Sequence, residues 1–163
     1  MLNNLIRPHE YPGKLFVVDV DAMVHAFAAD SGAKLWSAGI ATGDKNRAAL
    51  EQIRKGTATK EDIDMLIGAF NITEALAIMG KGYDWLDEIK QGQDALLALS
   101  RRGVARGMRF IMTAKEWELL KLVMDLHEEQ LAHATVYDIE KAHDFVQKVI
   151  SLGKARAIVE TRK

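Results

Sequence analysis

The protein is a chain of 163 residues, of which 48% are hydrophobic and 28% are charged, as in an ordinary folded domain. Its 22 basic and 23 acidic residues give a formal charge of −1, without the excess of lysine and arginine on which general DNA and membrane binders depend. The absence of cysteine excludes disulfides, thiolate zinc sites and a cysteine nucleophile.

The composition predicts a single helical domain over residues 1–163. Two prolines, Pro8 and Pro12, stand near the start and none follows, which is typical of a helical chain and unusual for an all-β one. No apolar run approaches the roughly 18 residues of a membrane span, and no signal-peptide pattern opens the chain. We therefore expect a cytoplasmic protein that has no membrane partner and needs no cofactor.

The first quarter of the chain is the hardest to interpret. Residues 1–13 form a polar lead that we expect to be extended, and residues 15–30 make the first element. The stretch "SGAKLWSAGIATG" follows; its glycines predict an irregular segment or a broken helix, which places Trp36 where it can meet a partner. Asp44 suits the N-cap of the helix "KNRAALEQIRK", and Gly56 ends that helix.

Three later helix starts carry capping-box spacing, a threonine followed by an acidic residue three positions on. The pairs are Thr59 with Asp62, Thr113 with Glu116, and Thr135 with Asp138. Apolar residues at spacings of three and four follow each pair. We predict an all-α fold, a helical bundle of about five to six helices built around two long αα-hairpins, residues 60–102 and 113–152. Residues 154–163 are expected to fray.

The stretch "TKEDIDMLIGAFNITEALAIMG" also has the outline of a helix-turn-helix, with "FNIT" as the turn. Its second half offers almost no side chain that reads bases, and Glu74 would face phosphate. One continuous or kinked core helix is the preferred interpretation.

The stretch "LFVVDVDAM" resembles the first motif of haloacid-dehalogenase-like phosphatases, in which an apolar strand delivers D-x-D. The resemblance implies that Asp19 is the nucleophile, that Asp21 is the general acid, and that both bind magnesium. Thr113, Lys115 and Asp138 follow in the order of the family's remaining motifs. The sequence departs from the family beyond Thr113, where it predicts capped helices in place of alternating strands and helices.

The same stretch fits an amphipathic helix, because its apolar residues recur with helical spacing. These residues are Phe16, Val20, Met23, Val24 and Phe27. Asp19 then lies on the other side, in the first turns, where the helix dipole favours acidic residues. A helix over residues 15–30 is the preferred interpretation, and the phosphatase is an alternative.

The histidines of "HEEQLAH" do not form a zinc motif, because His127 and His133 are six residues apart and point in different directions. Asp125, Glu129 and His133 share a face and are interpreted as a solvated polar face, so no metal site is predicted. His127 lies on the apolar stripe and is expected to be a hydrogen-bonded core histidine.

The densest basic cluster in the chain is "RRGVARGMR", which contains Arg101, Arg102, Arg106 and Arg109. Guanidinium groups match carboxylates and phosphates, so this cluster and Trp36 are the candidate binding residues. Arginines at a helix C-terminus also have a purely structural explanation in the helix dipole.

No nucleotide-binding or nucleophile-elbow motif occurs in the chain. We therefore expect a non-enzymatic protein that binds another protein, as an adaptor, inhibitor or regulator, and that also self-associates. Helical bundles with surplus apolar stripes commonly bury the excess against a partner or a second copy. Nucleic-acid binding through Arg101–Arg109 is the first alternative, and a magnesium-dependent phosphatase using Asp19 and Asp21 is the second.

Overall fold

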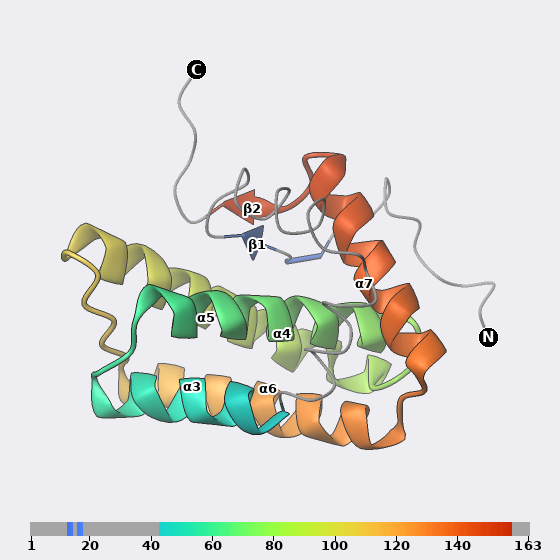
Figure 1. Cartoon of the computed structure of the whole chain (residues 1–163), viewed down its shortest axis with the longest axis horizontal. Coiled ribbons are helices and arrows are strands. Elements are labelled where there is room, and N and C mark those ends of the chain that lie inside the picture. The colour runs from blue at the N-terminus through green and yellow to red at the C-terminus, as the bar shows by residue number, and fades with distance from the viewer. Residues whose placement is uncertain (1–12, 15, 18–42, 158–163) are drawn as a thin grey trace.

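The computed structural model describes residues 13–14, 16–17 and 43–157, and five α-helices form a bundle in this part of the chain (Figure 1). The helices are α3 (Gly43–Lys55), α4 (Lys60–Ile78), α5 (Leu86–Ala105), α6 (Ala114–His133) and α7 (Val136–Ser151), with the 3₁₀ helix η3 (Tyr83–Trp85) before α5. The predicted all-α bundle is confirmed. The expectations for Asp19, Asp21, Trp36 and the lead up to residue 12 lie outside the described residues.

Capping explains where three of the helices begin. Thr59, Thr113 and Thr135 each accept a hydrogen bond from the backbone N–H three residues on, and the acidic residue there accepts the threonine's own N–H. All three capping boxes are therefore confirmed. Each box satisfies two backbone donors that a helix start would otherwise leave unpaired.

Helix α4 is the centre of the bundle, because it contacts α3, α5, α6 and α7. It runs without a break through "FNIT", which confirms one continuous core helix and not a helix-turn-helix. The first half of α4 packs in one hydrophobic cluster with α3, α5 and α6. Its last turns pack in a second cluster with α7, so α4 joins the two parts of the core.

The second helical pair departs from a simple hairpin. Helix α7 turns away from α6 and packs its buried face, which includes Ala142, Val146 and Val149, against the end of α4 (Figure 1). The side chain of Lys81, after α4, lies 3.4 Å from Asp138 of α7. The helices of residues 113–152 therefore do not pack only on each other, because α7 packs against α4 of the first hairpin.

Two short segments near the ends of the chain pair with each other. Strands β1 (Phe16–Val17) and β2 (Arg156–Ala157) run parallel, with Phe16 opposite Arg156 and Val17 opposite Ala157. The helix predicted from residue 15 is thus wrong at Phe16 and Val17, and the tail expected to fray is paired at Arg156 and Ala157. Pairing between segments so far apart in sequence leaves no local signal, which is why helical spacing was misleading here.

A buried carboxylate helps to hold β1 against α4. Glu74, the one charged residue on the apolar face of α4, is fully buried. Its two oxygens accept the backbone N–H of Lys14, at 3.0 Å and 3.3 Å. Within the described ranges, no helix combines the length and the apolar character needed to cross a membrane.

Candidate functional site

The α5–α6 loop, residues 106–113, contains much of the predicted arginine cluster. Helix α5 continues past Gly103 and ends at Ala105, so the loop begins directly after the helix. The carbonyl oxygen of Gly103 accepts the backbone N–H groups of Met108, at 2.8 Å, and Arg109, at 3.2 Å. These bonds turn the chain sharply back over the end of α5.

The turn places two successive residues in the left-handed region, Gly107 with φ +70° and Met108 with φ +67°. Glycine adopts this conformation readily, whereas a residue with a side chain adopts it only at an energetic cost. Met108 is the one non-glycine residue with positive φ in the described part of the chain. Its side chain nevertheless remains 47% exposed, so burial of Met108 does not explain the strain.

Phe110 fixes the loop to the bundle. Its ring is buried against Gly103, where an added Cβ would lie 2.1 Å from the ring Cδ1 atom. Only glycine therefore permits this close approach of the ring to α5. The loop is consequently anchored at its middle as well as at both ends.

Arg102 anchors the far side of the loop. Its guanidinium donates two hydrogen bonds to the carboxylate of Glu116, at 2.6 Å and 3.1 Å, and one to the carbonyl oxygen of Ile111, at 2.8 Å. Burial opposes ionisation of Glu116, but the bonds from Arg102 and from the Thr113 N–H hold the pKa of this carboxyl below its usual value. The hydrogen bond to Glu116 raises the pKa of Arg102. Arg102 is therefore a structural residue.

The remaining arginines of the cluster differ from Arg102. Arg101 is exposed near the end of α5. Arg106 and Arg109 are exposed on the loop itself, and neither side chain makes a hydrogen bond or ion pair with a described residue. Two guanidinium groups are thus available at the loop surface for a ligand or a partner.

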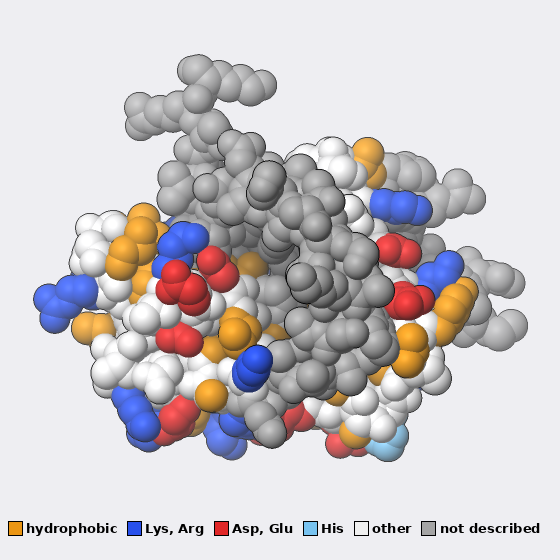
Figure 2. All heavy atoms as spheres, viewed as in Figure 1, with side chains coloured by type: hydrophobic (Ala, Val, Ile, Leu, Met, Phe, Trp, Pro, Cys, Tyr) orange, Lys and Arg blue, Asp and Glu red, His pale blue; other side chains and the backbone are white. Residues whose placement is uncertain are grey.

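Met108 and Ile111 lie beside these two arginines on the loop, and the sequence did not single them out as binding residues. Met108 is 47% exposed and Ile111 is 51% exposed, which is high for side chains of their size. Figure 2 shows hydrophobic and basic side chains next to each other at this end of the molecule, on the left of the view. The signal was available in the sequence, since "GMRFIM" is an apolar run with one arginine directly before the capping box of Thr113 and Glu116, and only some of its side chains can turn inward.

The predicted polar face of α6 is occupied by ion pairs. Asp125 accepts a hydrogen bond from Arg47 of α3 at 2.7 Å, and Glu129 lies 2.9 Å from His133. No cluster of three or more histidine or acidic side chains able to hold a metal is found in residues 43–157 or in the short N-terminal segments described with them. His127 is buried and hydrogen-bonded, which confirms its assignment to the core.

The residues that resemble the later phosphatase motifs are not brought together. Thr113 and Lys115 lie at the start of α6, whereas Asp138 lies beyond its end. A helix of the 20 residues of α6 is about 30 Å long, so these groups cannot share one magnesium ion. Thr113 and Asp138 instead serve in the capping boxes of α6 and α7.

Comparisons with known proteins identify no relative of this chain. No family model, no curated protein and no solved structure matches it.

Proposed function

We propose that the protein acts by binding another protein through the α5–α6 loop and performs no catalytic step of its own. The observation that supports this most directly is the combination of unpaired arginines with exposed hydrophobic side chains on an anchored loop. Arg106 and Arg109 supply the charge, and Met108 and Ile111 supply the apolar contact. Arginine and methionine are both enriched in protein interfaces.

The charge of the loop favours a partner with an acidic surface. The guanidinium groups of Arg106 and Arg109 have no partner among the described residues, so a carboxylate of a second protein can pair with them without first displacing an internal ion pair. A guanidinium binds a carboxylate through two parallel hydrogen bonds, which gives orientation as well as attraction.

The shape of the loop favours binding with little loss of entropy. Phe110 packed on Gly103 and the bonds of Arg102 to Glu116 and Ile111 fix the backbone before a partner arrives. A surface already in its binding conformation loses less freedom when the complex forms, and this raises affinity. The strained backbone at Met108 fits such a role, because strain persists where the surrounding structure enforces it.

Nucleic-acid binding through the same cluster is the alternative. With Arg102 neutralised by Glu116, the loop offers two unpaired guanidinium groups, whereas strong sequence-independent binders contact about 6–10 phosphates. The exposed Met108 and Ile111 add apolar area that phosphate binding does not use. Both features favour a protein partner over nucleic acid.

The proposal includes a cytoplasmic location and self-association. The cysteine-free composition and near-neutral charge suit a partner in a reducing compartment. Several large hydrophobic side chains elsewhere, among them Tyr83, Trp85 and Tyr137, are at least 46% exposed and offer further contact area for a second copy. Light scattering coupled to size exclusion measures this self-association directly.

The test is capture of a partner by the tagged protein from lysate of its own host, with nuclease and at two salt concentrations. We expect one protein to be recovered in stoichiometric amount. The double variant Arg106→Glu/Arg109→Glu should weaken its binding at least tenfold, because it brings like charges together in the interface. The variant Met108→Ser/Ile111→Ser should weaken binding of the same protein at both salt concentrations, since it removes apolar contacts.

The matched control is Lys148→Glu/Lys154→Glu, which makes the same charge change at exposed positions in α7 and just after it, away from the loop (Figure 1), and should leave recovery unchanged. Recovery that is lost on nuclease treatment would move the assignment to nucleic acid. A partner whose binding is insensitive to all four loop substitutions would overturn the proposal.

A further inference from the structure

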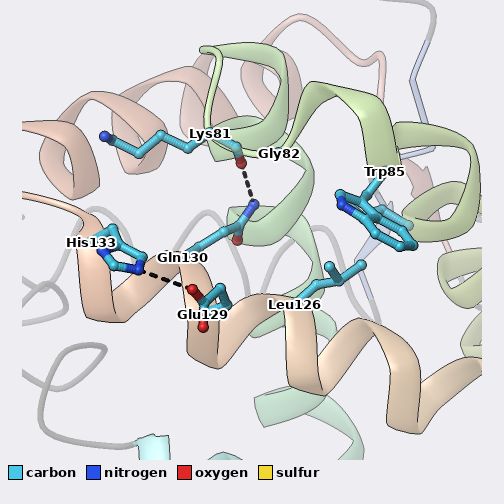
Figure 3. Close-up of a pocket in the computed structure, with 8 residues that line it drawn as sticks. Lys81, Gly82, Trp85, Leu126, Glu129, Gln130 and His133 are labelled. Atoms are coloured by element: carbon cyan, nitrogen blue, oxygen red, sulfur yellow. Dashed lines mark hydrogen bonds and ion pairs between the residues drawn. The ribbon is translucent and has the colours of Figure 1, made fainter.

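A pocket lies at the opposite end of α5 and α6 from the α5–α6 loop, where η3 and the turn after α4 meet the last turns of α6 (Figure 1). Its volume is about 250 Å³, and Trp85, Ile89 and Leu126 supply its apolar walls. Figure 3 shows Trp85 and Leu126 beside one another across this pocket. This end of the molecule therefore has an apolar recess at its surface.

Two large aromatic side chains are exposed on η3, which forms one side of the pocket. Tyr83 is 57% exposed and Trp85 is 46% exposed, and η3 has no buried residue. Tyrosine and tryptophan are enriched among the residues that contribute most to binding in protein interfaces. The side chains of η3 thus offer contact area to a second protein molecule.

The charges that flank Trp85 are acidic and unpaired. Asp84 and Asp87 are exposed, Glu88 is partly exposed, and none of these carboxylates makes a hydrogen bond or ion pair with a described residue. Acidic residues also suit the start of α5 through the helix dipole, so their presence alone does not indicate a binding site. Beside an exposed tryptophan and an apolar pocket, however, they supply the charge that a basic partner surface requires.

The α5–α6 loop has the complementary arrangement. Arg106 and Arg109, whose guanidinium groups are unpaired among the described residues, flank the exposed Met108. At the pocket, the exposed Trp85 lies between carboxylates in the same way. Complementary charges around an apolar contact orient two protein surfaces and disfavour wrong partners.

The two surfaces are too far apart to meet within one molecule. They lie at opposite ends of α5, whose 20 residues span about 30 Å. An ion pair requires its charged groups to approach within about 4 Å. Phe110, packed on Gly103, holds the loop at its own end of α5. Contact between the two surfaces therefore joins two copies of the chain.

Met108 has the size and the chemistry to enter the pocket. An apolar cavity of about 150 Å³ in another protein holds benzene, which has more heavy atoms than a methionine side chain. The thioether sulfur of methionine makes favourable contacts with aromatic rings, and Trp85 supplies such a ring. Burial in a second copy also explains the left-handed backbone of Met108, whose cost is not offset by burial within one copy.

We propose that the α5–α6 loop of one copy binds the η3 end of a second copy, with Met108 in the pocket beside Trp85 and the loop arginines paired to the carboxylates that flank Trp85. The inference rests on the binding role proposed for the loop, and it assigns the self-association to these two surfaces. Because the surfaces differ, each copy can bind one neighbour through its loop and another through its pocket. A contact limited to a loop and one pocket belongs to the small class, below about 1,200 Å², so assembly should depend strongly on concentration.

The test is sedimentation equilibrium of the purified full chain with charges reversed on each surface. The average mass of the wild-type protein should rise with concentration above that of a single chain. Arg106→Glu/Arg109→Glu should weaken association at least tenfold, because it sets acidic loop residues against the acidic pocket surface. Asp84→Lys/Asp87→Lys should do the same, since it sets lysines against the loop arginines.

Exchange of the charges should restore association. The chain that carries all four substitutions should associate like the wild type, and so should an equimolar mixture of the two double variants, because opposite charges face each other in both cases. Restoration excludes misfolding as the cause of the losses, since the same substitutions are present. Lys148→Glu/Lys154→Glu, at exposed positions in α7 and just after it, should leave association unchanged.

Two further variants locate the apolar contact. Leu126→Phe fills the pocket from a partly exposed position and should weaken association at least tenfold. Leu152→Phe makes the same change at an exposed position after α7 and should have no effect. Association that is unchanged in Leu126→Phe, or that does not return when the charges are exchanged, would overturn the inference. A wild-type chain that remains monomeric would overturn this inference alone, whereas capture from lysate that survives the loop substitutions would overturn the proposed function.

Discussion

The Nδ1 atom of His127 lies 2.9 Å from the hydroxyl oxygen of Thr73, at the buried contact between α6 and α4. The hydroxyl of Thr73 donates its own proton to the carbonyl oxygen of Ala69, at 2.8 Å. It therefore accepts from His127, which places the ring proton on Nδ1. The other nitrogen, Nε2, lies 3.4 Å from the amide nitrogen of Asn46 in α3 and acts as an acceptor. A neutral His127 thus links three helices.

This arrangement predicts a loss of stability in mild acid. Burial lowers the pKa of His127 from 6.5 to about 4, and the charge of Glu128 offsets only part of the effect. Between these two values the unfolded chain binds a proton on His127 that the folded protein does not, so stability falls as the pH falls. The free energy of unfolding is not reduced by this protonation above pH 6.5. The reduction is about 2 kcal/mol at pH 5 and about 3 kcal/mol below pH 4.

Urea midpoints at pH 7.5 and pH 5 measure this loss above the range in which most carboxylates titrate. In His127→Asn the amide can still donate to Thr73, but no imidazole titrates, so the variant should be less stable at pH 7.5 and should lose less on acidification. His133→Asn, at an exposed position, should retain the wild-type difference. An unchanged pH dependence in His127→Asn would show that another group is responsible.

The contact between Gly103 and Phe110 predicts that an ordinarily favourable substitution is harmful. Alanine stabilises a helix interior by about 1 kcal/mol over glycine, but at position 103 its Cβ would lie 2.1 Å from the ring of Phe110. Displacing the ring typically costs about 1–3 kcal/mol, so Gly103→Ala should be destabilising overall. Gly68→Ala is the matched control in α4, where the added Cβ would meet no atom within 4 Å apart from the surrounding backbone of its own helix, and it should be stabilising. Equal midpoints in urea for the two variants would contradict the packing described for the loop.

Local sequence patterns specified most of the helical architecture. The three threonine capping boxes, at Thr59, Thr113 and Thr135, predicted helix starts that the structure has at the same residues. This succeeded because both partners of a capping box lie within one turn of the chain. The prediction failed at Phe16, where the parallel partner is Arg156, far away in sequence. A pairing of that kind cannot be read from a window of neighbouring residues.

The sequence predicted the arginines of the candidate site, but not which of them are structural and which are exposed for binding. Sequence alone treats Arg102 and Arg106 as equivalent members of one cluster. The structure separates them, because the return of the chain after the loop brings Glu116 to Arg102 and leaves Arg106 exposed. The sequence also did not predict the pocket between Trp85 and Gln130, since its walls come from the turn after α4, from η3, from α5 and from α6, and no motif connects them.

The two arginines should therefore respond differently to the same change. Arg102→Met leaves the mostly buried carboxylate of Glu116 without its guanidinium and should lower stability by about 1–3 kcal/mol. Arg106→Met changes an exposed, unpaired side chain and should alter stability by no more than about 0.5 kcal/mol. Thermal and urea unfolding of both variants provide the measurement. Similar losses in the two would mean that Arg106 has a structural role that its surroundings do not indicate.

The ion pair between Arg156 and Asp94 predicts that the tail stabilises the start of the chain. Arg156 donates to the Asp94 carboxylate on α5 at 2.9 Å and to the backbone carbonyl of Lys14 at 2.8 Å, so it ties β2 to both. Arg156→Ala should lower stability by about 1 kcal/mol, because both bonds are partly exposed. The amides of Phe16 and Val17 should then exchange with deuterium faster, by a factor of about five. Lys154→Ala removes an exposed charge two residues away and should change neither quantity. If Arg156→Ala left amide exchange at Phe16 and Val17 unchanged, the pairing of β1 with β2 would not depend on this side chain.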